Sequence, residues 1–365
     1  MKRNIDIIII TYNRLKFIKR TLDSVFAESS PIRDYEMTIL DNCSTDGTSE
    51  FLVSFAKEHP NLKVVRNIRN IGGNANICRA YETSLTKNAD YVWVLCDDDT
   101  FDFSNWGEVE EQIAKGTDVI CVCNYALPKD FTQKEVVPYL PLQLSFVPAG
   151  IYKKSLINDE VLTNMYDSIF TMFQQDILCL EALNKKKSIY VVKNEIVHNG
   201  VFEEKNDADY SYTRGTRHVL KRRNDTTWTL GFSNVLTYLD DEKLRKQAMG
   251  IALNSKCIFL HGISDFLNAE IRNYVRNSGE HYLEEIKNVV DEETKKQIDE
   301  KIIEFENEIE HRRKPFFHYE DKRLRTRVKK ILKKYFPNMF KFLKRSRDMV
   351  ALKFKNNRGG DKSIV

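Results

Sequence analysis

Three adjacent carboxylates, Asp97, Asp98 and Asp99, follow directly after the apolar run Tyr91–Cys96. Neighbouring acids repel one another, so their ionised forms need a compensating charge. A divalent cation that carries an anionic ligand supplies this charge, because carboxylate oxygens are hard ligands that suit Mg²⁺ or Mn²⁺. At the end of a buried strand, the triplet therefore predicts metal-assisted handling of a phosphate. The alternative is a solvated acidic turn, because runs of acids are usually exposed.

The elements that must position this triplet alternate between strand and helix patterns in the first half of the chain. The predicted strands are β-branched and apolar runs at Ile5–Ile10, Met37–Leu40, Val64–Val65, Tyr91–Cys96 and Val119–Val122. The predicted helices cover residues 15–26, a segment after the N-cap candidates Ser44, Thr45 and Asp46, and residues 79–85. This alternation predicts an α/β fold in which helices flank both faces of a mostly parallel sheet.

Polar features follow several of these strands. Thr11 follows the first strand, Asp41 follows the second, the loop 67–73 follows the third, and the acid triplet follows the fourth. Ligands of open α/β sheets bind beyond the carboxyl ends of the strands. We therefore expect these four features to converge on one rim of the sheet and to form a binding site there.

Composition limits the class of protein. At 365 residues and 42% hydrophobic content, the chain has room for one large domain or two. Its seven cysteines form no Cys-x-x-Cys pair, which argues against a zinc site or a disulfide framework and favours a reducing, cytosolic compartment. The apolar run Ile7–Ile10 is too short for a signal peptide, and no stretch of about 18 apolar residues predicts a membrane span.

Charge is unevenly distributed. Residues 321–358 carry 15 Lys and Arg against 2 Asp and Glu, although the whole chain has a net charge of only +4. Val328, Ile331, Leu332 and Tyr335 share one helical face in this basic segment, a pattern typical of an interfacial helix on anionic lipid. The apolar stripe argues against nucleic-acid binding. A further alternative is packing on the catalytic domain or on a second subunit, which leaves an oligomer open.

Four motifs occur in a characteristic order and resemble the family 2 glycosyltransferases of the GT-A fold, over about residues 4–100. They are Thr11-Tyr12-Asn13-Arg14, the stretch from Asp41 through Ser44 and Asp46-Gly47-Thr48, the loop Asn70-x-Gly72-Gly73 with Asn76 and Arg79, and Asp97-Asp98-Asp99. The resemblance implies a GT-A, Rossmann-like sheet followed by a helical C-terminal region.

The resemblance also implies roles for these residues. Thr11, Tyr12 and Asp41 would bind the nucleotide base and ribose, and Asp97 and Asp98 would contact the ribose or the donor sugar. Asp99, with Asp97, would hold the Mn²⁺ or Mg²⁺ ion that bridges the diphosphate. The remaining donor-binding candidates are Asn13, Arg14, Asn70, Gly72, Asn76 and Arg79. The expected donor is a UDP-sugar.

Asp176 is the candidate general base. The family often has Glu-Asp at the start of a helix, and here Gln175-Asp176 occupies that place, with Gln in the position of Glu. It follows the segment 148–154, which resembles the acceptor-side Gly segment of the family. We expect the helix N-terminus to keep the carboxylate ionised. The alternative is that Asp176 is only an acid in the first turn of a helix.

Two further candidates lie beyond this segment. His198 could be an additional metal ligand or a phosphate contact, or it could be structural. The basic segment 210–223, which includes Arg214 and Arg223, could close over the diphosphate or meet a pyrophosphate-linked acceptor. The alternative for that segment is a solvated basic helix face.

The resemblance implies a domain organisation. Residues 1–211 would be the catalytic domain, with a nucleotide-binding half (1–100) and an acceptor half (101–211). Apart from the resemblance, the residue pattern itself predicts that residues 212–320 are helical, that residues 321–358 form basic amphipathic helices and that residues 359–365 are a disordered tail.

The implied function is that of an enzyme, an inverting and metal-dependent glycosyltransferase. It would move a sugar to a hydroxyl of a glycan or of a polyprenyl-pyrophosphate-linked acceptor in surface-polysaccharide synthesis of the O-antigen or capsule type. It would be cytoplasmic and peripheral on the inner face of the plasma membrane. One alternative is a nucleotidyltransferase of related fold, which the lack of a Gly-rich basic loop after Ile10 disfavours. Another is a catalytically silent nucleotide-sugar-binding scaffold, which the intact acids disfavour.

Overall fold

The structure is a computed structural model that describes residues 4–198, 226–254 and 287–312. By its contacts the chain divides into two units, residues 1–303 and residues 304–365. The elements that position the rim and the candidate residues all belong to the first unit. The boundaries predicted at residues 211, 320 and 358, the basic segment 321–358 and the tail 359–365 lie outside the described residues and stay predictions.

Within the described residues, seven strands form one sheet in the order β3-β2-β1-β4-β7-β6-β8, and β5 pairs with β9 in a second sheet. The strands are β1 (Ile5–Thr11), β2 (Met37–Asp41), β3 (Leu62–Arg66), β4 (Tyr91–Cys96), β5 (Thr100–Phe101), β6 (Val119–Cys121), β7 (Gly150–Lys153), β8 (Ile189–Val191) and β9 (Val197–His198). In the large sheet only β7 runs antiparallel to its neighbours. The prediction of a mostly parallel sheet is therefore confirmed.

Helices connect and cover these strands. The α-helices are α1 (Leu15–Val25), α2 (Thr48–Glu58), α3 (Gly73–Ser84), α4 (Trp106–Lys115), α5 (Leu140–Leu144), α6 (Asp159–Asp167), α7 (Asp176–Asn184), α10 (Thr226–Leu236), α11 (Glu242–Asn254) and α14 (Glu292–Arg312). Short 3₁₀ turns lie at Phe103–Asn105, Val137–Tyr139, Val147–Ala149, Lys154–Leu156 and Ile169–Thr171, the last labelled η5. The described part of the chain beyond residue 212 is helical, as predicted.

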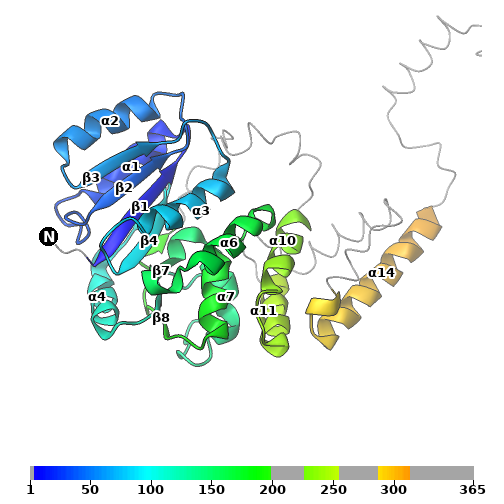
Figure 1. Cartoon of the computed structure of the whole chain (residues 1–365). Helices are drawn as coiled ribbons and strands as arrows, with labels where there is room; N and C mark the ends of the chain where they lie inside the picture. Colours follow the sequence, from blue (N-terminus) through cyan, green and yellow to red (C-terminus); the bar gives the residue numbers. More distant parts are fainter. Residues whose placement is uncertain (1–3, 199–225, 255–286, 313–365) are drawn as a thin grey trace, which may run out of the picture. The chain divides into compact units, whose positions relative to one another are not determined.

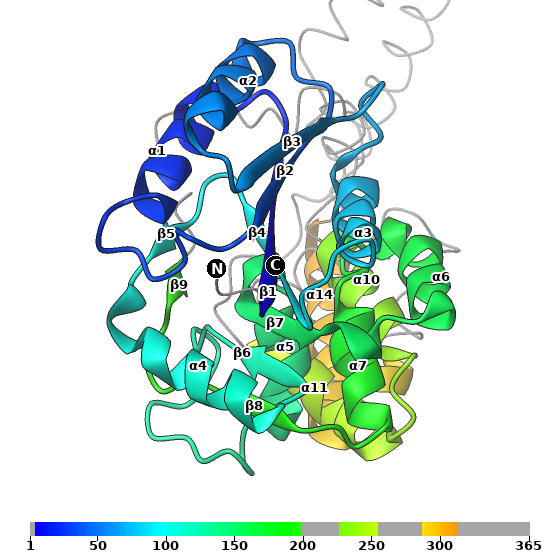
Figure 2. The same ribbon diagram turned by 60° about the vertical axis from the view of Figure 1, so that its left-hand side comes forward.

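The sheet has helices on both faces. In Figures 1 and 2, α1 and α2 lie on one face of the β1–β4 part and α3 lies on the other. Helix α1 buries Ile18, Leu22 and Val25, the apolar positions that recur at helical spacing. Strand β1 is buried along almost its whole length, because a parallel strand has helices over both of its faces.

Helix α3 begins six residues earlier than predicted. Gly72 precedes it with a φ of 87°, and the Asn70 side chain accepts a hydrogen bond from the Gly72 N–H group at 2.8 Å. The first turn contains Asn74 and Asn76, and asparagine has low intrinsic helix propensity. The sequence pattern indicated a polar segment at residues 67–76, because the tertiary contacts of Asn74 and Asn76 that hold this turn are not visible in it.

The register of the strands creates the predicted rim. Thr11 pairs with Asp41 across β1 and β2, and Ile10 pairs with Cys96 across β1 and β4. Thr11, Asp41 and the acid triplet after Cys96 therefore leave the sheet at the same edge. This convergence, predicted from the order of strands and polar residues, is confirmed.

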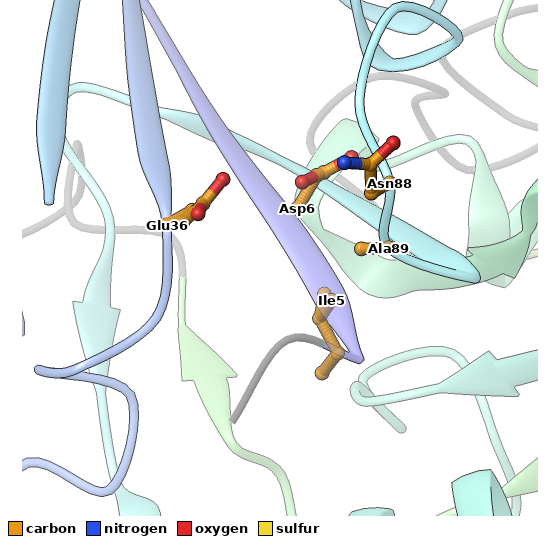
Figure 3. Close-up of a pocket in the computed structure, with 5 residues that line it drawn as sticks. All are labelled: Ile5, Asp6, Glu36, Asn88 and Ala89. Atoms are coloured by element: carbon orange, nitrogen blue, oxygen red, sulfur yellow. The ribbon is translucent and has the colours of Figure 1, made fainter. Parts of the chain in front are cut away.

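A buried ion pair lies at the other end of the strands, opposite to the rim. Lys154, directly after β7, contacts the carboxylate of Asp6 and donates a hydrogen bond to the carbonyl oxygen of Ser84 at 2.7 Å. A cavity of about 20 Å³ adjoins Asp6 and is lined by Ile5, Asp6, Glu36, Asn88 and Ala89 (Figure 3). A space of this size holds about one water molecule. It is too small for a nucleotide, and the rim is the candidate site because polar residues that follow neighbouring strands converge there.

Within the described residues, the helices are too short or too polar to cross a bilayer. The cysteines of this part of the chain, Cys43, Cys78, Cys96, Cys121, Cys123 and Cys179, are free thiols.

Replacement of Lys154 by Met should destabilise the fold by about 3–5 kcal/mol, because it leaves the Asp6 carboxylate buried without its partner. Burial raises the pKa of Asp6, and Lys154 opposes that rise. The double variant with Asp6→Asn should regain much of the loss. Urea unfolding of the two variants and the wild type measures this difference. Equal stability of the single and double variants would contradict the pair's role.

Candidate functional site

The acid triplet is buried and not a solvated turn. Asp97, Asp98 and Asp99 are only 3%, 6% and 1% exposed. The Thr11 hydroxyl donates to Asp97 at 2.6 Å, and one nitrogen of Arg14 donates to Asp97 at 2.8 Å and to Asp98 at 2.9 Å. Burial raises the pKa of Asp97 to about 6, although Arg14 opposes this rise. An internal cation thus compensates two of the three acids.

Asp99 lacks such compensation. One of its oxygens accepts a hydrogen bond from the backbone N–H of Cys96 at 2.9 Å, and its other oxygen, Oδ1, is buried without a hydrogen-bond partner. Burial, reinforced by the neighbouring Asp98, raises its pKa well above the ordinary value. A buried carboxylate oxygen without a donor fits a divalent cation. The described residues offer no cluster of three His, Cys, Asp or Glu ligands, so any such ion would take its other ligands from water or phosphate.

The first helix fixes the backbone of the triplet. Thr21 donates to the carbonyl oxygen of Asp97 at 2.8 Å, and Arg20 donates to that of Asp98 at 3.1 Å. The guanidinium of Arg14 stacks on the Phe17 ring, with 4.8 Å between its central carbon and the ring centroid. The segment from β1 through α1 therefore acts as one support for the acids after β4.

Asp41 is fully buried, and internal donors surround its carboxylate. The backbone N–H of Ser44 donates to it at 2.9 Å, the hydroxyl of Ser49 contacts its other oxygen, and Arg66 lies 3.4 Å from that oxygen. Asp41 thus fixes the turn between β2 and α2. Its implied contact with a nucleotide base or ribose stays a prediction.

Four asparagines connect the loop 67–73 and the start of α3 to the end of β2. Asn67 donates to Asn42 at 2.9 Å and to Asn76 at 3.0 Å, and Asn42 donates to Asn70 at 2.8 Å. The backbone N–H of Ile71 also donates to Asn42 at 3.0 Å. Asn70 and Asn76, predicted as donor-binding residues, therefore shape the loop through these bonds. Contact of either residue with a ligand stays a prediction.

Several residues of the site have left-handed backbone conformations. Asn13, Cys43 and Met172 have φ values of 52°, 69° and 70°. Such conformations strain residues that carry a Cβ atom, and they concentrate at functional sites where the surroundings enforce them. Asn13 is held by the Ser44 hydroxyl, which accepts from its N–H at 2.9 Å, and by the Thr45 N–H, which donates to its side chain at 2.6 Å.

Asp176 begins α7, as predicted, and it is fully buried. Neither of its carboxylate oxygens has a hydrogen-bond partner. Burial raises its pKa well above the ordinary value, so the helix N-terminus does not offset the cost of burying the charge as expected. Burial is the main cause that raises the pKa of Tyr81 in α3, and the Cys96 thiol and the Asp176 carboxyl raise it further.

The remaining candidates have different surroundings. His198 of β9 pairs with Thr100 of β5, the residue directly after Asp99. Its Nδ1 atom lies 3.0 Å from the carboxylate of Glu195. Tyr12 and Arg79 are half-buried, and Gly72 is exposed at the start of α3. The metal role of His198 and the donor roles of these three residues stay predictions. The basic segment 210–223 lies outside the described residues.

Sequence reasoning missed residues that support the site. Asn42, Asn67 and Ser49 hold the loops after β2 and β3, and Asn74 donates to the carbonyl oxygen of Ile169 at 2.6 Å. The density of asparagine between residues 67 and 76 was a signal, because asparagine side chains often bond to neighbouring backbone groups. Their pairing with Asn42 depends on the sheet and is not visible in the sequence.

The sequence is similar to those of known glycosyltransferases. Residues 6–178 match the family described as glycosyl transferase family 2. The glycosyltransferase AglE of Haloferax volcanii is 21% identical over 230 residues, which cover 63% of this chain and 64% of that protein. The abequosyltransferase RfbV of Salmonella typhimurium is 32% identical over 91 residues, or 24% of this chain and 26% of that protein. These matches span less than two thirds of the relatives' own lengths.

A solved structure supports the fold. The crystal structure of TarS 1–349 of S. aureus in complex with UDP superposes with a TM-score of 0.51 at 14% identity, covering 87% of this chain and 94% of that one. The TarS sequence, a poly(ribitol-phosphate) β-N-acetylglucosaminyltransferase of Staphylococcus aureus, is 27% identical over 213 residues, or 53% of this chain and 36% of that protein. The predicted GT-A type of sheet is confirmed by this likeness.

Replacement of Arg14 by Gln should destabilise the protein by about 3–5 kcal/mol, because two buried carboxylates lose their internal cation. Arg14→Lys should lose less, since it keeps the charge. Added Mg²⁺ or Mn²⁺ should stabilise the Gln variant more than the wild type, because the ion takes over part of the compensation. Thermal unfolding with and without metal measures both effects. An unchanged midpoint in the Gln variant would contradict this role.

Asp176→Asn should stabilise the fold at neutral pH. The native pKa of Asp176 lies above its unfolded value near 4. The native state therefore binds the extra proton, and wild-type stability falls as the pH rises from about 4 through the raised pKa. The variant lacks this fall, so its advantage in melting temperature should grow with pH, by about 2–4 °C per kcal/mol. The exposed Asp130→Asn is the control, and an advantage independent of pH would contradict the account.

Proposed function

We propose, because residues 6–178 match glycosyl transferase family 2, that the chain moves a sugar from a nucleotide-diphosphate donor to a hydroxyl acceptor with inversion at the anomeric carbon. The observation that carries this proposal is the presence of two buried carboxyl groups with oxygens that lack partners, Asp99 and Asp176. They come from different halves of the domain, and each fits a different task. Asp99 would hold a cation, and Asp176 would accept a proton.

The donor side is the rim formed by β1, β2 and β4. A divalent cation bound at Asp99 would supply positive charge that stabilises the diphosphate leaving group. Arg14 keeps Asp97 and Asp98 in place as hydrogen-bond acceptors, so they can face the hydroxyl groups of a ribose or sugar. The asparagine network holds the loop 70–73 beside this rim. These residues bind and orient the donor.

The acceptor side is Asp176. In the proposed step its carboxylate removes the proton of the acceptor hydroxyl, and the resulting oxygen attacks the anomeric carbon. The bond between that carbon and the diphosphate oxygen breaks, and the nucleoside diphosphate leaves with the electron pair. Burial raises the pKa of Asp176, which brings a general base closer to the working pH. Gln175 donates to the carbonyl oxygen of Ser145 and so fixes the start of α7.

The relatives support the proposed class of substrates. TarS is a poly(ribitol-phosphate) β-N-acetylglucosaminyltransferase and was solved with UDP, and RfbV is an abequosyltransferase. We therefore propose a UDP-sugar donor and a glycan or polyprenyl-pyrophosphate-linked acceptor of a surface polysaccharide. Attachment to the inner face of the plasma membrane through residues 321–358 is part of the same proposal and rests on sequence alone.

The two carboxyl groups should separate binding from chemistry. Asp99→Asn should weaken metal-dependent binding of UDP, because an amide nitrogen replaces one carboxylate oxygen and the negative charge that would attract the cation is lost. Asp176→Asn should leave UDP binding unchanged but lower transfer by about 10²–10⁴-fold, the usual contribution of a general base. Calorimetry with UDP and Mn²⁺ measures binding, and a panel of nucleotide sugars with a lipid-linked acceptor extract measures transfer.

The same panel distinguishes the alternatives. Formation of pyrophosphate from a nucleoside triphosphate and a sugar phosphate would indicate a nucleotidyltransferase. Binding of a nucleotide sugar without turnover would indicate a scaffold. Near-normal transfer by Asp176→Asn would remove Asp176 from its proposed role.

A further inference from the structure

Helix α10 lies against the segment that leads to Asp176. Gly231 of α10 faces the turn η5 so closely that a Cβ atom on it would come within 1.9 Å of the carbonyl oxygen of Thr171. No side chain fits in that space, and the obstacle is backbone, which cannot rotate away as a side chain can. In Figures 1 and 2, α10 lies beside α7, which it contacts. Only a glycine allows the helix to approach this turn.

The residues around this contact lead directly to the carboxyl group. Phe232, next to Gly231, packs edge-on against Phe173, with 5.3 Å between the ring centroids. The Phe173 N–H donates to the Thr171 hydroxyl at 3.0 Å, and the Asp176 N–H donates to the Phe173 carbonyl oxygen at 2.9 Å. Displacement of η5 or Phe173 would therefore move the start of α7.

The other side of the segment is held by the donor half. Asn74 donates to the carbonyl oxygen of Ile169 at 2.6 Å and contacts the sulfur of Met172 at 3.0 Å. Met172 has a φ of 70°, a conformation that a non-glycine residue keeps only under constraint. The segment 168–175 is thus fixed between α3 and α10, and removal of either contact should release it.

We propose that α10, through Gly231 and Phe232, is the positioning element that sets the place of Asp176, so that the helical region beyond the family domain is required for transfer but not for donor binding. The proposal rests on the proposed function of Asp176 as the base. Neither residue touches a substrate in this account. They act through Thr171 and Phe173. A misplacement of about 1 Å at a reacting group can lower a rate by about 100-fold.

Gly231→Ala in the full chain tests this proposal. Its matched control is Gly107→Ala in α4, where an added Cβ would meet nothing within 4 Å. In the Gly231 variant, hydrogen exchange should become about 10-fold faster in peptides from residues 169–180 and stay unchanged in peptides of β1 and β4. Transfer should fall about 10- to 100-fold, with the dissociation constant of UDP changed less than about two-fold. The control should match the wild type in all three measurements.

A second variant serves if Gly231→Ala does not fold. Phe232→Leu adds no atoms to the side chain and removes the ring contact with Phe173, so it should cause the same pattern with a smaller change. Its control is Phe26→Leu, which removes a similar edge-on contact, with 5.5 Å between the ring centroids of Phe26, directly after α1, and Phe55 of α2. Wild-type exchange and transfer in the Phe232 variant would overturn the proposal, as would an equal increase of exchange in β1 and in residues 169–180.

The hydrogen-exchange measurement needs no substrate. If the wild type neither binds UDP nor transfers a sugar, the proposed function fails while the exchange pattern still decides whether α10 positions the segment. If transfer is present and the pattern is not, the positioning proposal fails alone.

Discussion

The burial of three adjacent carboxylates at the end of one strand is the constraint on which the rest of this structure depends. Like charges at this separation cannot all stay ionised in a dry environment unless opposite charge or donors surround them. Arg14 crosses from the end of β1 to serve Asp97 and Asp98, and Thr11 adds a short hydrogen bond. The turn after β1 and the first helix are therefore connected to the end of β4 by these ion pairs as well as by the sheet.

This compensation is incomplete by one group. Asp99 keeps an oxygen without a partner, and Asp176 keeps two, although unsatisfied buried polar atoms are rare and destabilising in folded proteins. Stability alone would favour removing these carboxyl groups. Their persistence is understandable if a cation and an acceptor hydroxyl complete them during turnover. The surrounding fold, with strained turns at Asn13, Cys43 and Met172, maintains this arrangement.

The supports of the site come from residues that carry no motif. Asn42 and Asn67 hold the loop 67–73 at the end of β2, and Gly231 lets α10 approach the turn before Asp176. These contacts join segments that lie far apart in the chain. They also divide the site into the rim, supported by the sheet, and the start of α7 with Asp176, supported by helices.

Sequence by itself determined strands β1, β2, β3, β4 and β6, the order of their polar endings and the rim, but not strands β5, β7, β8 and β9. It could do so because apolar runs of β-branched residues specify buried parallel strands, and parallel strands present their carboxyl ends at one edge. The early start of α3 escaped it, since tertiary hydrogen bonds outweigh the poor helix propensity of Asn74 and Asn76.

Only the tertiary structure decided how charge is distributed in the site. The sequence named Arg14 only as a donor-binding candidate, and its pairing with the acids requires the register of β1 against β4. Likewise, the helix N-terminus suggested an ionised Asp176, whereas full burial raises its pKa. The physical reason is the same in both cases. A pKa depends on desolvation and on neighbouring charges, and both are properties of packing that no local pattern specifies.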